Sequence, residues 1–325
     1  MQKKKKMTLE EFQENETPGL LAIYDFTSNI AISNYIDTTV VKIPEACYSS
    51  SLLAKTHFLS ETYLMNRKRS SMDMGLSYGV MGYSSFSVRG SIVQRILAEK
   101  EELEHKNLTI QLPKYKHIKM PLGTAIRARR SIRKMTDAAM TIEDLSTILY
   151  YADGVTGELT LQSGEKDPLA LNTLGDNCNA TLRSAPSGGG LFPITLYMVL
   201  RNVDDGVYYY LPLEHSIRLV KKLDGNLEDD INHVAEWGIN IEQKKINVII
   251  FYVYSLYNNS RKYSDMAYDF AMVEVGQISE NIQLTCTAEG IASCDIGGFE
   301  KYKCENFLEI DGLTKNIVNV TIIGK

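Results

Sequence analysis

"RSAPSGGGLFPITLYMVLR", residues 183–201, sets a proline, a serine and three glycines against an apolar run. Within regular structure a glycine costs about 0.5–1 kcal/mol relative to alanine, so a cluster of three needs a physical reason. The run 194–201 has the composition of a buried strand. The cluster before it is either a plain turn into that strand or a place where a flat or charged ligand approaches bare backbone.

Outward from this stretch, alternating strand and helix patterns predict a layered α+β or α/β domain. A helix is predicted over 141–154, where Thr141 and Asp144 suit an N-terminal cap and Gly154 suits the end. Residues 155–182 are predicted to form a long irregular loop, and such loops often serve as lids or binding loops. The remaining predicted elements are strands 206–212, 246–256, 291–297 and 316–324 and a buried helix over 266–290.

Composition excludes several classes of function. The chain has 325 residues and a formal charge of −5, which leaves no overall basic footprint for nucleic acid. Its five cysteines form no CxxC pair and its five histidines are scattered, so we expect no metal site and reduced thiols. We find no membrane-spanning run and no signal peptide, and we expect a cytoplasmic protein.

A basic segment lies N-terminal to the predicted helix 141–154. Five of the eight residues 127–134 are arginine or lysine, with Ser131 among them. If the segment were helical, Arg129 and Arg133 would repel each other unless an anion lay between them. Arginine binds phosphate through two parallel hydrogen bonds, and serine adds a further donor. The segment is therefore either a solvated helix end or an anion site.

Three separated motifs occur in an order that resembles the nitroreductase-like flavoproteins: "RRSIR" (129–133), "APSGGG" (185–190) and "IGGF" (296–299). Within that superfamily the chain resembles the SagB-type dehydrogenases, which oxidise azoline rings in ribosomally made peptides. The resemblance covers about residues 120–325. It implies an α+β, nitroreductase-like fold, with a central mixed, mainly antiparallel sheet flanked by helices. It also implies FMN bound without covalent attachment at a homodimer interface.

The resemblance also implies roles for individual residues. The phosphate and ribityl tail of FMN would be bound by Arg129, Arg130, Ser131 and Arg133. The ring edge would lie beside the backbone of Pro186, Ser187, Gly188 and Gly189. The amides of Gly297 and Gly298 would lie near the flavin nitrogen that accepts hydride, although paired glycines after a strand also form ordinary turns.

On the predicted helix 266–290, Gln277 and Asn281 share one face and resemble residues of the family's central helix. They either bind the cofactor or satisfy buried backbone groups.

Lys262 and Tyr263, in "RKYSDMAY", match a Lys-Tyr pair of the azoline-oxidising branch. Aromatising an azoline removes a hydride and a proton from adjacent carbons, so a base is needed beside the flavin. Tyrosine has a pKa of about 10 and is a poor base unless a cation stabilises its phenolate. Adjacent helical residues point about 100° apart, so cooperation requires a loop or a helix start. Thr195 stands where the branch often has an acidic residue.

These observations predict two regions and one leading function. Residues 1–118, including a charged helix pattern at 91–107, would form a mostly helical N-terminal extension for docking or dimerisation, and 119–325 the FMN domain. The leading hypothesis is an azoline dehydrogenase acting on a precursor peptide beside a cyclodehydratase. The alternatives are a flavin reductase of dehydroamino acids in a lanthipeptide, an NAD(P)H nitroreductase, or a non-catalytic scaffold.

Overall fold

A computed structural model of the chain describes residues 63–64, 80, 109–162, 177–201, 206–223 and 241–325. Most of the predicted N-terminal extension, including the helix expected at 91–107, lies outside the described residues.

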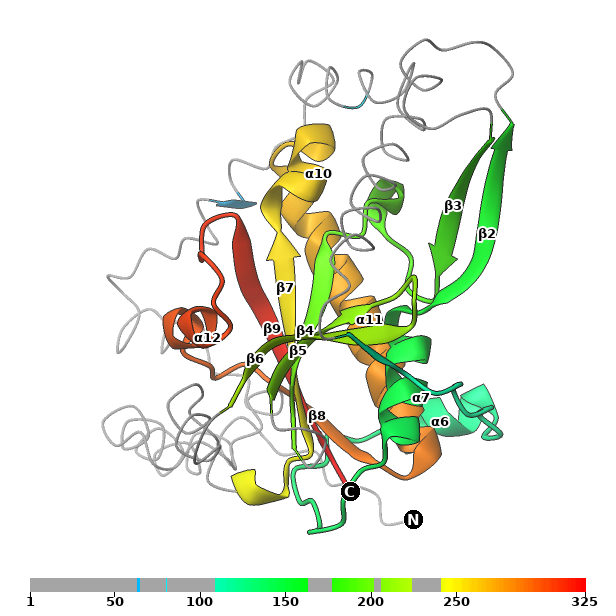
Figure 1. The fold of residues 1–325 in the computed structure, drawn as a ribbon, viewed down its shortest axis with the longest axis vertical. Coiled ribbons are helices and arrows are strands. Elements are labelled where there is room, and N and C mark those ends of the chain that lie inside the picture. The colour runs from blue at the N-terminus through cyan, green and yellow to red at the C-terminus, as the bar shows by residue number, and fades with distance from the viewer. Residues whose placement is uncertain (1–62, 65–79, 81–108, 163–176, 202–205, 224–240) are drawn as a thin grey trace, which may run out of the picture. The chain divides into compact units, whose positions relative to one another are not determined.

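The centre of the described structure is a seven-stranded sheet in the order β1-β6-β5-β4-β7-β9-β8 (Figure 1). Each pair of neighbouring strands in it is antiparallel, so the α+β class is confirmed with a sheet more regular than the mixed one expected. The strands are β1 (Thr109–Gln111), β4 (Ile194–Leu200), β5 (Gly206–Leu211), β6 (Ser216–Lys222), β7 (Val248–Ser255), β8 (Ala292–Ile296) and β9 (Lys315–Gly324).

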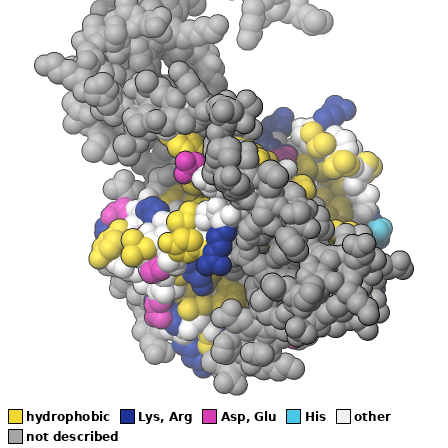
Figure 2. Space-filling model, turned by 90° about the horizontal axis from the view of Figure 1, so that it is seen from above, with side chains coloured by type: hydrophobic (Ala, Val, Ile, Leu, Met, Phe, Trp, Pro, Cys, Tyr) yellow, Lys and Arg dark blue, Asp and Glu magenta, His cyan; other side chains and the backbone are white. Residues whose placement is uncertain are grey.

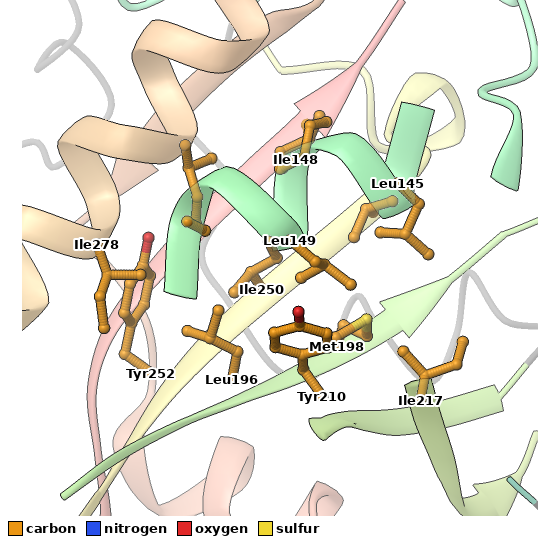
Figure 3. Packing of buried hydrophobic residues seen from close by; sticks show 14 of the residues in the cluster. Leu145, Ile148, Leu149, Leu196, Met198, Tyr210, Ile217, Ile250, Tyr252 and Ile278 are labelled. Atoms are coloured by element: carbon orange, nitrogen blue, oxygen red, sulfur yellow. The ribbon is translucent and has the colours of Figure 1, made fainter. Parts of the chain in front are cut away.

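Both faces of the sheet are covered, which explains why its central strands are almost continuously apolar. Along β7, Ile250 and Tyr252 point to one core, and Ile249 and Phe251 point to the other. The first core is covered by α7 (Ile142–Asp153) and α11 (Met266–Glu289), and the second by α12 (Lys301–Phe307). Figure 3 shows side chains of α7 and α11 over the sheet residues of the first core.

Helix α7 begins as its sequence predicts. The Thr141 hydroxyl accepts from the Asp144 N–H at 3.2 Å, and the Asp144 carboxylate accepts from the Thr141 N–H at 3.1 Å, forming a capping box. The end of α7 differs from the usual glycine cap because Gly154 has an ordinary φ of −73°. Glycine is needed there for space, since a β-carbon would lie 2.5 Å from the Tyr150 carbonyl oxygen.

The expected irregular loop 155–182 is wrong where the structure describes it, and residues 163–176 lie outside the described residues. It contains β2 (Val155–Gln162) and β3 (Asn177–Arg183), which pair antiparallel in a two-stranded sheet of their own. The polar residues between the apolar ones concealed the strands. The two strands satisfy their backbone groups by pairing with each other, outside the seven-stranded sheet.

Several short helices and 3₁₀ turns connect the main elements. Helix α6 (Leu122–Ala128) precedes the basic segment, and a 3₁₀ turn, η2 (Gly188–Gly190), lies within the glycine cluster. A second 3₁₀ turn, η3 (Gln243–Lys245), leads toward β7, and α10 (Leu256–Tyr263) follows it. Among the described residues, no helix is long and apolar enough to cross a membrane.

Candidate functional site

The glycine loop, residues 186–190, is a tight turn that places backbone at the surface of α11. Gly189 and Gly190 have φ values of 67° and 65°, which favour glycine. The Gly190 N–H donates to the Ser187 carbonyl at 3.0 Å, and the Phe192 N–H donates to Ser187 Oγ at 2.9 Å. Ser187 therefore holds the turn closed while the glycines leave the backbone bare.

The structure brings the Lys-Tyr pair, Lys262 and Tyr263, directly to this loop. A β-carbon on Gly189 would lie 2.5 Å from Tyr263 Oη and 2.8 Å from Lys262 Nζ. A β-carbon on Gly188 would lie 3.2 Å from the Phe270 β-carbon on α11. The glycines are thus required for close approach as well as for backbone conformation.

The pair lies in the last turn of α10, not in the loop or helix start expected for cooperation. The two long side chains nevertheless converge, and α10 ends at Ser264, whose φ is 51°. Lys262 Nζ lies 5.2 Å from the Tyr263 ring centroid.

Burial has opposite effects on the two pKa values. It lowers the pKa of Lys262 and raises that of Tyr263, because it disfavours whichever form is charged. Burial therefore favours the uncharged form of each side chain, the phenol of Tyr263 and the neutral amine of Lys262.

Residues 129–133 of the basic segment lie outside any helix, because α6 ends at Ala128. The repulsion considered for a helical Arg129 and Arg133 therefore does not arise. The Arg129 Nη1 donates to Gln283 Oε1 of α11 at 2.9 Å, and the Ile132 N–H donates to the Ser293 carbonyl of β8 at 3.0 Å.

The other polar side chains of the basic segment are exposed. The Arg130 guanidinium donates to the carbonyls of Arg127 and Arg129 at 3.1 and 2.7 Å, so it folds back on its own backbone. Ser131 and Arg133 are exposed, and both act on the Cys294 thiol of β8 in the direction that lowers its pKa, although burial raises that pKa overall. On the face drawn in Figure 2, lysines and arginines lie among apolar and acidic side chains rather than in one broad patch.

Helix α11 connects the glycine loop to the basic segment. Glu274 of α11 lies behind Ser187, and Gln283, which binds Arg129, comes nine residues later, roughly 14 Å along the helix axis. Gln277 is half-buried between these positions. Asn281 donates to the Ala152 carbonyl at the end of α7 at 3.4 Å, the structural role considered for it from the sequence.

Gly297 and Gly298 are exposed immediately after β8, the strand that also binds the basic segment. A β-carbon on Gly297 would meet no atom within 4 Å among the described residues. The space beside this backbone is open, as a ligand-facing position requires, and no internal contact accounts for the glycine.

The sequence reasoning missed several polar residues of the site. Glu274, Gln283 and Asp295 are on α11 and β8, and each makes contacts that only packing reveals. The sequence signal that could have identified them is the presence of charged or amide side chains in segments whose other residues predict burial. Pro186, which was predicted to lie at the ring edge, is exposed at the start of the glycine loop.

The described structure combines an antiparallel α+β fold with a glycine loop that faces a Lys-Tyr pair. Residues 126–325 match the Nitroreductase family, which is more than half of the chain. The protein therefore belongs to the nitroreductase family.

The chain is also similar to individual proteins. A nitroreductase-type protein of Methanocaldococcus jannaschii is 29% identical over 206 residues, which is 62% of this chain and 90% of that protein. A solved nitroreductase-type structure from Ralstonia eutropha JMP134 has the same fold, with a TM-score of 0.52 and 19% identity over 68% of this chain and 90% of that one. The Escherichia coli microcin synthetase McbBCD complex with truncated pro-MccB17 bound gives a TM-score of 0.48 and 19% identity over 70% of this chain and 81% of that one.

Proposed function

We propose that the protein is an FMN-dependent dehydrogenase that converts thiazoline or oxazoline rings of a ribosomal peptide to thiazole or oxazole. The observation that carries the proposal is the convergence of Lys262 Nζ and Tyr263 Oη on the bare backbone of Gly189. The SagB-type sequence resemblance of the same pair supports it. A proton-accepting group beside the glycine loop is what an azoline oxidation needs.

The residues present fit FMN. The glycine loop carries no β-carbons at Gly188 and Gly189, so the tips of Lys262 and Tyr263 reach its backbone, and Gly297 adds a backbone position with open space beside it among the described residues. Arg129 and Arg133 offer guanidinium groups for a phosphate. In this proposal Arg129, Ser131 and Arg133 bind the phosphate end, and Arg130 joins them by leaving its backbone carbonyls. Ser187, Gly188, Gly189, Gly297 and Gly298 line the ring, with Gln277 on the helix between.

Bound FMN supplies a two-electron acceptor for the hydride that leaves one ring carbon of the azoline. The adjacent carbon loses a proton to Lys262 in its neutral amine form, which burial favours over the ammonium. Tyr263 keeps its proton, because burial raises its pKa, and donates a hydrogen bond that orients the substrate ring. Atoms and charge balance, since the substrate loses one hydride and one proton.

The proposal is tested with purified protein, FMN and a thiazoline-bearing peptide in air, with the product followed by mass spectrometry. We expect a loss of two hydrogens per ring. Lys262→Gln is expected to lower the rate about 100-fold, within the range typical of general-base removal, and to leave FMN bound. Tyr263→Phe is expected to lower the rate by a smaller factor.

Arg261→Gln and Tyr257→Phe are the matched controls, because both residues are exposed on α10. We expect each control to keep the wild-type rate. Unchanged turnover in Lys262→Gln would remove the lysine from the chemistry. Rapid anaerobic bleaching of the flavin by NAD(P)H, with no change in the mass of the peptide, would replace the proposal by a reductase.

The quaternary proposal is a homodimer that works with a cyclodehydratase on the precursor peptide. Apolar side chains exposed on α6 and α11 support a contact with a second copy, since Ile126 is 54% and Val273 58% exposed. Ile126→Asp is expected to shift the mass in light scattering from dimer to monomer. A wild-type protein that is monomeric at micromolar concentration would contradict the proposed homodimer.

A further inference from the structure

A hydrogen-bond network of mostly buried side chains lies behind the basic segment, and its centre is the half-buried carboxylate of Asp295 on β8. Asp295 accepts from Ser279 Oγ of α11 at 2.6 Å and from Thr321 Oγ1, its cross-strand neighbour on β9, at 2.6 Å. It also accepts from Gln283 Nε2 at 3.2 Å. Tyr252 Oη lies 2.9 Å from Thr321 Oγ1 and must donate to it, because the threonine hydroxyl proton is directed at Asp295.

This network determines which way the Gln283 amide faces. Its Nε2 donates to Asp295 and, at 3.1 Å, to Ser279 Oγ. A carboxylate can only accept, so it holds the NH₂ end of the amide toward the sheet. The amide oxygen must then face outward, where it accepts from Arg129 Nη1 at 2.9 Å. Gln283 is buried, so water competes little for these bonds.

We propose that Asp295, acting through Gln283, is a positioning residue that holds the Arg129 guanidinium ready for the FMN phosphate. The inference rests on the proposed function in one respect, which is that Arg129 binds the phosphate. Neither Asp295 nor Gln283 touches the anion in this proposal. Their effect is to restrict the arginine before the ligand arrives.

The physical advantage is preorganisation. A free arginine side chain loses rotamer entropy when it binds an anion, and an arginine already held by a fixed acceptor loses less. A guanidinium has five N–H donors, so the bond to Gln283 leaves others for the phosphate. The hydrogen bonds run from the Asp295 carboxylate through the Gln283 amide to the Arg129 guanidinium. They therefore keep the amide oxygen, an acceptor, against Arg129, and not the amide NH₂ group, a competing donor.

Asp295→Asn tests this series of hydrogen bonds, because asparagine has almost the same shape as aspartate. The asparagine NH₂ group would face the Gln283 NH₂ group, so one of the two amides must turn. If Gln283 turns, it presents a donor to Arg129 and the arginine loses its acceptor. Gln283→Leu removes the acceptor directly and serves as the second variant. Glu305→Gln is the matched control, because Glu305 is a buried carboxylate on α12 that accepts from the Ile317 N–H.

The measurement is the ratio of the dissociation constants of riboflavin and FMN, obtained by titration of flavin fluorescence. Riboflavin lacks the phosphate, so a general loss of structure moves both constants and leaves the ratio unchanged. We expect the preference for FMN to fall about tenfold in Asp295→Asn and Gln283→Leu, the effect of weakening one charge-assisted hydrogen bond. Glu305→Gln is expected to keep the wild-type ratio.

The possible outcomes separate the two levels of the proposal. A wild-type preference for FMN that persists in both variants would overturn the positioning role alone. A wild-type protein that binds neither flavin, or both equally, would overturn the phosphate assignment and the positioning role with it. If one variant fails to fold, the ratio in the other decides.

Discussion

Glu274 gives the most quantitative prediction, because its carboxyl is buried behind the glycine loop. It is 2% exposed, and its Oε1 accepts from the Ile194 N–H at the long distance of 3.4 Å. Burial raises its pKa to about 8; the Ser187 hydroxyl acts against this shift, and the negative charge of Asp153 adds to it. Glu274 is therefore protonated in the folded protein at neutral pH.

The sign of the effect follows from proton linkage. In the unfolded chain the carboxyl has its ordinary pKa of 4.5 and is charged at neutral pH. Between about pH 4.5 and 8 the folded state holds one proton more than the unfolded state. The free energy of unfolding therefore falls as the pH rises, by about 1.4 kcal/mol per unit from this group. From pH 5.5 to 7.5 the loss amounts to roughly 2–3 kcal/mol.

Glu274→Gln keeps the shape of the protonated carboxyl and cannot ionise. We expect urea unfolding at pH 5.5, 6.5 and 7.5 to show a flatter pH dependence for this variant, with higher stability than the wild type at pH 7.5. Glu280→Gln, on the exposed side of α11, controls for the loss of one glutamate. Parallel curves for Glu274→Gln and wild type over this range would refute the argument.

Three further predictions concern other parts of the structure. Replacing Arg129 and Arg133 together by alanine should lower FMN occupancy, at about 1.5–3 kcal/mol for each charged contact, and an undiminished flavin absorbance at saturating protein would contradict this. Gly189→Ala should displace the tips of the Lys-Tyr pair and strain a φ of 67°, costing about 1–2 kcal/mol of stability and slowing turnover more than it weakens FMN binding; equal effects on both would argue against the geometry. Asp144→Asn should lower the free energy of unfolding by about 1–2 kcal/mol at pH 7 by weakening the capping box and the ion pair with Lys116, and the difference should shrink below pH 4, because these partners hold the pKa of the aspartate well below its usual range.

The sequence predicted much of the fold because its signals are local. The capping box at Thr141 and Asp144, the apolar run of β4 and the span of α11 were all readable from neighbouring residues. The hairpin β2–β3 was missed because its residues are mixed in character and pair with each other away from the main sheet. An isolated pair of strands has no strong burial pattern to reveal it.

The candidate site was predicted as a set of motifs, without their arrangement. The sequence could place Lys262 and Tyr263 in one dipeptide, and the resemblance could place them near a flavin. Neither indicated that the side chains of Lys262 and Tyr263 both end at the backbone of Gly189. From the sequence, tyrosine could act as a base only if a cation stabilised its phenolate, whereas in the structure burial favours the uncharged form of both side chains.

By itself the sequence determined helices α7 and α11, strands β4, β5, β7, β8 and β9, the position of the glycine loop and the presence of a basic segment, because each depends on residues close together in the chain. Tertiary structure alone decided which of these segments meet and how their side chains ionise. The protonated state of Glu274 and the orientation of the Gln283 amide by Asp295 are the clearest cases. Both depend on burial and on acceptors supplied by distant strands, because a hydrogen-bond direction or a pKa is set by the three-dimensional surroundings of a group.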